Sequence, residues 1–149
     1  MQGASVHAMH IGGAYNFPFG KVKATIAHHG SSITTEDGKL ITIGSPCGFL
    51  ITLGGRTIYH AGDTGLFLDM KLIGELNNIE VAMLPIGGNY TMDINDAAKA
   101  VEFLDPETVI PMHYKTFPVI EANPQVFADK VKAMGKEARV LEIGETLEL

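Results

Sequence analysis

Alternating apolar and polar residues predict strands in the first half of the chain. Between Val22 and His28 the side chains alternate with a period of two, which is typical of a strand with one buried face. Cys47–Leu53 and Thr57–Tyr59 are apolar runs on either side of Gly54-Gly55. Glycine readily takes the positive φ angles of a tight turn, so these two runs predict a hairpin.

Short apolar runs predict further strands in the second half. Glu80–Leu84 and Glu107–Pro111 are mostly continuous in apolar residues, which is typical of strands covered on both faces. Proline cannot donate to a ladder, so we expect Pro111 to end the second run. Two last strands are predicted over Arg139–Ile143 and Thr146–Leu149.

Helices are predicted between these strands. Apolar residues recur at helical spacing in three places, namely Leu66, Met70 and Ile73; Ala97, Val101 and Leu104; and Phe127, Val131 and Met134. Asp93 precedes the second helix and Asn123-Pro124 precedes the third, as N-cap and first-turn residues often do. From residue 57 onward the order alternates strand and helix, which predicts an α/β layered domain with helices packed on a mixed sheet.

Composition limits the class of protein. The 149 residues are 46% hydrophobic and show no repeat or linker, so residues 1–149 are interpreted as a single domain. No run approaches the roughly twenty apolar residues of a membrane span. Cys47 is the one cysteine, which favours a reducing cytoplasm. Eleven basic and seventeen acidic residues give 11 − 17 = −6, a charge that disfavours nucleic acid as the partner.

Three predicted strands are followed by a residue that can bind a divalent metal. These residues are His29, Asp63 and His113. Ligand sites of layered α/β folds lie beyond the carboxyl ends of strands. Two imidazoles and a carboxylate form a donor set that suits zinc, manganese or iron. The sequence therefore predicts a metal site built from these three residues.

Each residue alone also has a structural interpretation. Gly-Asp-Thr around Asp63 is more often a turn or a helix cap, and a single histidine is more often a hydrogen-bonded structural residue than a ligand. Strand alternation sends His28 and His29 to opposite faces, so one of them can reach a common site. His60 is expected to support the site or the core. His7 and His10 lie in a first strand-like stretch and are expected to be structural or near the site.

Five motifs together resemble the metallo-β-lactamase superfamily. They are Ala27–Ser32, Thr57–Thr64, Met70–Asn78, Leu84–Gly87, and Pro111–Tyr114 with Thr116–Pro118. The match is closest to a branch of short metal-dependent hydrolases that is distantly similar to the ascorbate-6-phosphate lactonases. The resemblance implies an αββα sandwich with helices outside the sheets, and a site that holds two divalent metals, zinc or manganese.

The same resemblance assigns roles to the three candidates. His29 matches the histidine that ends the third metal-binding motif, and His113 matches the last ligand. Asp63 matches the aspartate that bridges the two metals, and is therefore the expected catalytic residue. The family's leading motif, His-x-His-x-Asp-His, does not occur in this sequence. The chain thus resembles the C-terminal part of such a domain, and we expect a site that lacks its N-terminal ligands.

Two functions are expected from these observations. The first is a metal-dependent hydrolase, in which metal-activated hydroxide attacks a small ester, lactone or phosphoester and an N-terminal portion completes the site. The alternative is a non-catalytic, truncated protein that folds by self-association. Loss of leading strands would expose apolar surface and a strand edge. The expected partners are therefore a second copy of the chain, giving a homo-oligomer, or an N-terminal partner chain.

Overall fold

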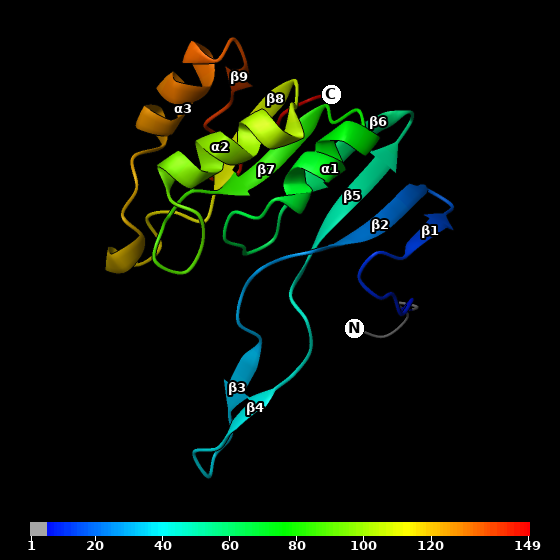
Figure 1. Ribbon diagram of the computed structural model, residues 1–149, viewed down its shortest axis with the longest axis vertical. Coiled ribbons are helices and arrows are strands. Elements are labelled where there is room, and N and C mark those ends of the chain that lie inside the picture. The colour runs from blue at the N-terminus through cyan, green and yellow to red at the C-terminus, as the bar shows by residue number, and fades with distance from the viewer. Residues whose placement is uncertain (1–5) are drawn as a thin grey trace.

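Three parallel strands form the centre of a seven-stranded sheet in the computed structural model, which describes residues 6–149 (Figure 1). They are β6 (Arg56–His60), β7 (Val81–Pro85) and β8 (Thr108–Met112). Side chains on both faces of β7 are buried, as its apolar run predicted. Pro111 lies inside β8 and does not end it, because the outer neighbour β9 (Glu137–Ala138) pairs with Thr108 and Val109 alone.

Antiparallel strands extend the sheet on the other side. The predicted hairpin is confirmed: β5 (Cys47–Leu53) pairs with β6, and Gly54 and Gly55 in its turn have φ angles of +57° and +87°. β2 (Gly20–Ile26) pairs with β5, and β1 (Ala14–Phe17) forms the edge. β1 was not predicted, because its four residues are largely exposed and lack an apolar alternation.

Three α-helices connect the strands of the second half, as predicted. They are α1 (Asp69–Leu76), α2 (Ile94–Leu104) and α3 (Pro124–Ala133), with a short 3₁₀ turn, η1 (Pro118–Ile120), before α3. Both predicted caps are confirmed. The Asp93 carboxylate accepts hydrogen bonds from the N–H groups of Asn95 and Asp96 in α2, and the Asn123 side chain accepts one from the N–H of Gln125 in α3. These bonds satisfy donors that a helix start leaves unpaired.

The helices cover one face of the sheet and form the core with it (Figure 1). The largest side chains that this core buries completely are Tyr59, Phe127, Met70, Leu84, Ile86, Met92 and Leu104. Helices α1 and α2 approach closely at Gly74, where a Cβ atom would lie 2.4 Å from the carbonyl oxygen of Phe103. Within residues 6–149 no helix is long and apolar enough to cross a bilayer.

The end of the chain differs from the prediction. Strands over Arg139–Ile143 and Thr146–Leu149 are wrong, since the structure has only the two-residue β9 in this region. The apolar residues there are at most half-buried, and Ile143 is fully exposed. Leu141, Leu147 and Leu149 line a cavity of about 250 Å³ on the sheet face opposite the helices, together with residues of β6, β7 and β8.

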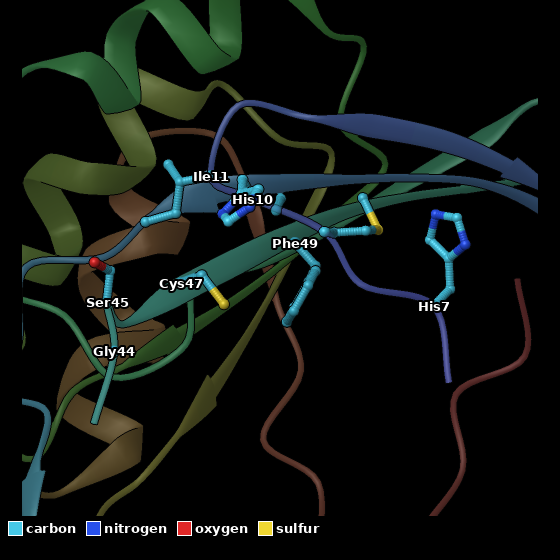
Figure 2. Close-up of a pocket in the computed structure, with 9 residues that line it drawn as sticks. His7, His10, Ile11, Gly44, Ser45, Cys47 and Phe49 are labelled. Carbon is cyan, nitrogen blue, oxygen red and sulfur yellow. The ribbon is translucent and has the colours of Figure 1, made fainter. Parts of the chain in front are cut away.

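The start of the described chain is also not a strand. His7 and His10 precede β1 in a segment that forms no helix or strand. They line a cavity of about 680 Å³ on the sheet with Cys47 and Phe49. Figure 2 shows Cys47 and Ser45 at one end of this cavity and His7 at the other. The two histidines therefore border the sheet, and the ring of His7 packs against Tyr15 at a centroid distance of 3.9 Å.

A small second sheet projects from the domain. β3 (Ser32–Thr34) and β4 (Leu40–Thr42) form an antiparallel ribbon that extends away from the large sheet (Figure 1). We call residues 31–45 the arm. The sequence predicted no element here, because each strand has three residues and neither is buried.

Two hydroxyl groups are buried in the core without a hydrogen bond of good geometry among the described residues. They are Tyr59 Oη and Thr25 Oγ1. Burial raises the pKa of Tyr59 to about 12, more than the neighbouring Thr25 hydroxyl lowers it. A tyrosinate at this position would be a buried charge, so the folded state resists ionisation that the unfolded chain undergoes near pH 10.

We predict that Tyr59→Phe reduces the alkaline sensitivity of the fold. In the parent chain, the free energy of unfolding should fall as the pH rises from 10 to 12, because the unfolded state loses its Tyr59 proton first. The pKa difference of about two units between the folded and the unfolded state corresponds to about 3 kcal/mol of unfolding free energy. In the variant, the free energy of unfolding should fall much less over this pH range. At pH 7 it should differ from that of the parent chain by less than about 1 kcal/mol, since the hydroxyl lacks a partner.

Urea unfolding at pH 7, 10 and 11.5 measures this difference. Tyr90→Phe, at a side chain that is 55% exposed, is the matched control and should behave like the parent chain. If Tyr59→Phe and Tyr90→Phe lose equal stability at alkaline pH, the buried Tyr59 hydroxyl is not the cause of the alkaline sensitivity.

Candidate metal site

The carboxyl ends of four strands meet at one edge of the sheet. β6, β7 and β8 are parallel, and β2 runs in the same direction because it is separated from β6 by the antiparallel β5. The loops that follow these strands carry His29, Asp63 and His113. The chain topology therefore brings the three predicted residues to the same side of the domain.

Thr64 joins these loops from a completely buried position. Its hydroxyl accepts a hydrogen bond from the backbone N–H of His28 (2.9 Å) and donates one to the carbonyl of Gly65 (2.7 Å). Its own carbonyl accepts from the N–H of Met92, and the N–H of Gly65 donates to the carbonyl of His28. Sequence reasoning missed this role, although a hydroxyl residue directly after Gly62-Asp63 is a signal for such local hydrogen bonding.

Asp63 and His113 lie next to each other. The Asp63 Oδ2 atom is 3.4 Å from His113 Nε2, and the two side chains are 46% and 27% exposed. Asp63 follows a turn at Gly62 that requires glycine, because its φ is +66° and a Cβ atom there would lie 2.5 Å from the Cys47 carbonyl oxygen. His60 shapes the same turn, since its Nδ1 accepts a hydrogen bond from the N–H of Gly62.

The backbone around the pair adopts conformations that side chains usually avoid. Among the described residues, four non-glycine residues have positive φ: Asn89, His113 and Lys115 in the loops at this edge, and Asp105 at the end of α2. His113 itself has a φ of +53°. Such conformations cost of order 1–3 kcal/mol each and concentrate at functional sites. Their clustering supports a functional role for these loops.

Close packing fixes the position of His113. A Cβ atom on Gly87 would lie 2.4 Å from the His113 carbonyl oxygen and 2.9 Å from Ile120, so the loop after β7 is pressed against the loop after β8. The following residue, Tyr114, is partly buried, and burial together with the charge of Glu142 raises the pKa of its phenol. The Tyr114 phenol packs against the hydrophobic core, and its raised pKa keeps it protonated further into the alkaline range.

The structure does not bring His29 into this pair. His29 is exposed, and its Nδ1 lies 2.9 Å from the carbonyl oxygen of Gly30. β2 ends at Ile26, two residues before the predicted end of the strand. The neighbouring His28 ring stacks on Phe67 at 4.9 Å with an interplanar angle of 6°. Within residues 6–149, no group of three or more His, Cys, Asp or Glu side chains is arranged to hold a metal ion.

Comparison with known proteins places the chain in a family. Residues 3–113 match the profile of the beta-lactamase superfamily domain. A UPF0173 metal-dependent hydrolase of Bacillus licheniformis is 57% identical over 148 residues, which are 99% of this chain and 64% of that relative. YtkL of Bacillus subtilis, with the same description, is 56% identical and is covered to 65%. The chain thus spans a little under two thirds of the length of these curated relatives.

Solved structures agree with the fold. Igni18, a metallo hydrolase of Ignicoccus hospitalis, superimposes with a TM-score of 0.83 at 43% identity, over 98% of this chain and 61% of that chain. A Thermotoga maritima protein of the metallo-beta-lactamase superfamily gives a TM-score of 0.60 at 26% identity, over 81% of this chain and 57% of that chain. The predicted α/β class with a mixed sheet and external helices is confirmed.

The Asp63–His113 pair fits two ligands of one divalent metal. Metal bonds of about 2.1 Å at tetrahedral angles place neighbouring donor atoms about 3.4 Å apart, and Oδ2 and Nε2 are separated by 3.4 Å. Both side chains are open to solvent, so an ion can reach them. The other ring nitrogen, His113 Nδ1, is buried and has no partner among the described residues, although a ligating histidine usually donates this N–H to an oxygen.

We predict that the chain binds zinc or manganese weakly through Asp63 and His113. Two ligands leave most of a coordination shell to water, so the metal should be lost on extensive dialysis. Asp63→Asn and His113→Ala should each weaken binding of Co²⁺ by at least about tenfold, which is about 1.4 kcal/mol. Elemental analysis and titration followed by Co²⁺ absorption measure these effects.

His10→Ala removes an exposed histidine outside the pair and serves as the control, with unchanged affinity. A stoichiometric metal that survives dialysis would show that the site is more complete than two ligands. Equal affinity in all three variants would place the binding site elsewhere.

Proposed function

The chain belongs to the beta-lactamase superfamily, and we propose that it carries the Asp63 and His113 part of the metal site of a metal-dependent hydrolase. The observation that supports this proposal is the pair itself. A carboxylate and an imidazole lie 3.4 Å apart where the carboxyl ends of the central strands meet, in loops with a strained backbone. The relatives that cover almost all of this chain are described as metal-dependent hydrolases.

Each residue has a distinct task in this proposal. Asp63 and His113 would hold the metal, zinc or manganese, with Asp63 as the carboxylate ligand and His113 as the imidazole ligand. When bound, such metals lower the pKa of water and polarise the substrate oxygen. The packing of Gly87 against His113 and the hydrogen bonds of Thr64 hold the loops that carry the two ligands next to each other. His29 is proposed as a further ligand, which requires its side chain to leave the Gly30 carbonyl.

The substrate class that suits this chemistry is a small ester, lactone or phosphoester. An ester, lactone or phosphoester offers an electrophilic carbon or phosphorus and an oxygen that a cation can polarise. The fold alone does not choose among them. The net charge of −6 disfavours nucleic acid as substrate. Cys47 is free and half-buried, which is compatible with the cytoplasm as the proposed compartment.

We propose further that ligands beyond the 149 residues complete the site, on an N-terminal portion or partner chain. The observation behind this proposal is that the described residues contain no cluster of three ligands. The same absence favours the alternative function, a non-catalytic protein that self-associates. The two proposals differ in whether added N-terminal residues create activity.

We predict that joining the N-terminal portion of the Bacillus licheniformis relative to this chain produces a metal-dependent hydrolase. The joined protein should retain metal after dialysis and cleave at least one of three probes: a nitrophenyl ester, a lactone or a bis-phosphodiester. His113→Ala should reduce that rate by at least about 100-fold, because it removes a ligand of the activating metal. The chain alone should show no rate above its own His113→Ala variant.

The matched control is His10→Ala in the joined protein, which should keep the full rate. A folded joined protein that retains metal and cleaves none of the probes would favour the non-catalytic alternative. A rate that survives both EDTA and His113→Ala would show that the chemistry does not depend on this site.

A further inference from the structure

Lysine is rare in the loops at the edge of the sheet that carries Asp63 and His113. The loops after β2, β6, β7 and β8 contain two lysines and no arginine, in residues 27–46, 61–68, 86–93 and 113–123. The first, Lys39, lies at the tip of the arm and pairs with Asp37. The second, Lys115, is exposed and forms no ion pair within residues 6–149. An ammonium group without a carboxylate partner therefore lies two residues after His113.

The backbone places Lys115 on the same side of its loop as His113. Tyr114, between them, packs against the hydrophobic core, whereas His113 is partly exposed and Lys115 is exposed. The N–H of Lys115 donates to the carbonyl of Ile120 (2.9 Å), which closes the loop behind it. Two residues span at most about 7 Å, and the lysine amine is carried on a flexible stem. The amine can therefore reach a small molecule bound at His113.

The backbone conformation of Lys115 favours glycine. Its φ is +60°, which glycine adopts without steric cost and which other residues adopt at a cost in free energy. Non-glycine residues in such conformations concentrate at active sites and ligand clamps. A long cationic side chain thus occupies a position that the local backbone would give to glycine, which indicates that the side chain itself has a task.

We propose that Lys115 is a specificity residue whose ammonium group binds an anionic group of the substrate, a carboxylate or a phosphate beside the scissile bond. This inference rests on the proposed hydrolase function and narrows its substrate class to small anionic esters and lactones. An ionised donor and acceptor form a strong hydrogen bond. The chain has a net charge of −6 and repels anions as a whole, so an anionic substrate requires a local cation.

The acidic residues nearest in these loops have other roles, so they leave Lys115 available. Asp63 would be bound to the metal. The Asp93 carboxylate caps α2, where the positive end of the helix dipole offsets its charge. Neither carboxylate forms an ion pair with Lys115 among the described residues.

The test uses the protein that joins the N-terminal portion of the relative to this chain, with three nitrophenyl esters. Their acyl groups have the same length and end in a carboxylate, a phosphate or an uncharged amide. Lys115→Gln should raise the KM for at least one anionic ester by at least about fivefold, because a charged hydrogen bond to the substrate is lost. The KM for the amide ester and kcat for all three should stay within about twofold. The anionic ester with the larger change identifies the group that Lys115 binds.

Three further variants separate charge from loop structure. Lys115→Arg keeps the charge and should keep the preference for the anionic ester. Lys115→Gly removes the charge while relieving the positive φ, so it should raise the same KM as Lys115→Gln. Lys130→Gln is the matched control, since it removes an exposed lysine of α3 that also forms no ion pair among the described residues, and it should behave like the parent.

The outcomes distinguish this inference from the proposed function. An equal rise in KM for all three esters in Lys115→Gln would show that the residue supports the loop, and would overturn the inference while the hydrolase function stands. An unchanged KM for both anionic esters would overturn it in the same way. A joined protein that neither retains metal nor cleaves any ester would instead overturn the proposed function, and the role of Lys115 with it.

Discussion

The position of Asp63 depends on the hydrogen bonds made by the buried Thr64 hydroxyl. The domain consists of an antiparallel half, β1, β2 and β5, and a parallel half with helices, and these halves share a ladder along β5 and β6. Beyond the end of that ladder, Thr64 bonds to His28 at the end of the first half, and its carbonyl accepts from Met92 in the second. Because Thr64 is completely buried, water cannot replace these hydrogen bonds. Asp63 directly precedes Thr64, so the same hydrogen bonds fix the position of its backbone.

The parallel strands provide the second constraint. Successive parallel strands present their carboxyl ends at the same edge, so the loops after β6, β7 and β8 must share a small space. The structure resolves this crowding with positive φ angles at Asn89, His113 and Lys115 and with Gly87 where no side chain fits. Bringing three loops together accounts for these backbone conformations, and the result is an imidazole beside a carboxylate, 3.4 Å apart.

Local patterns predicted the parts of the fold that local chemistry determines. Asp93 and Asn123 cap helices because their side chains reach amides two or three residues away, and Gly54-Gly55 forms a turn for a similarly local reason. The C-terminal strands were wrong because an apolar residue such as Leu147 can lie half-buried against a sheet face without joining a ladder. The arm was not predicted because its strands are exposed on both faces and so need no alternating apolar pattern. Asp63 and His113 were predicted as neighbours from strand ends alone, while the rotamer and hydrogen bond of His29 depend on contacts that no sequence pattern records.

The arm is attached to the sheet through a closed base. The N–H of Ala27 donates to the carbonyl of Pro46, and the N–H of Ile43 to that of Ser31, so the chain leaves and re-enters the domain at nearly the same point. Residues between these bonds add length without changing the register of β2 against β5. Loop-closure entropy grows only slowly with length, so this stretch is free to lengthen, shorten or change in evolution at small thermodynamic cost. It is the part of the domain where new contacts can arise while His28, Thr64 and the site edge stay as they are.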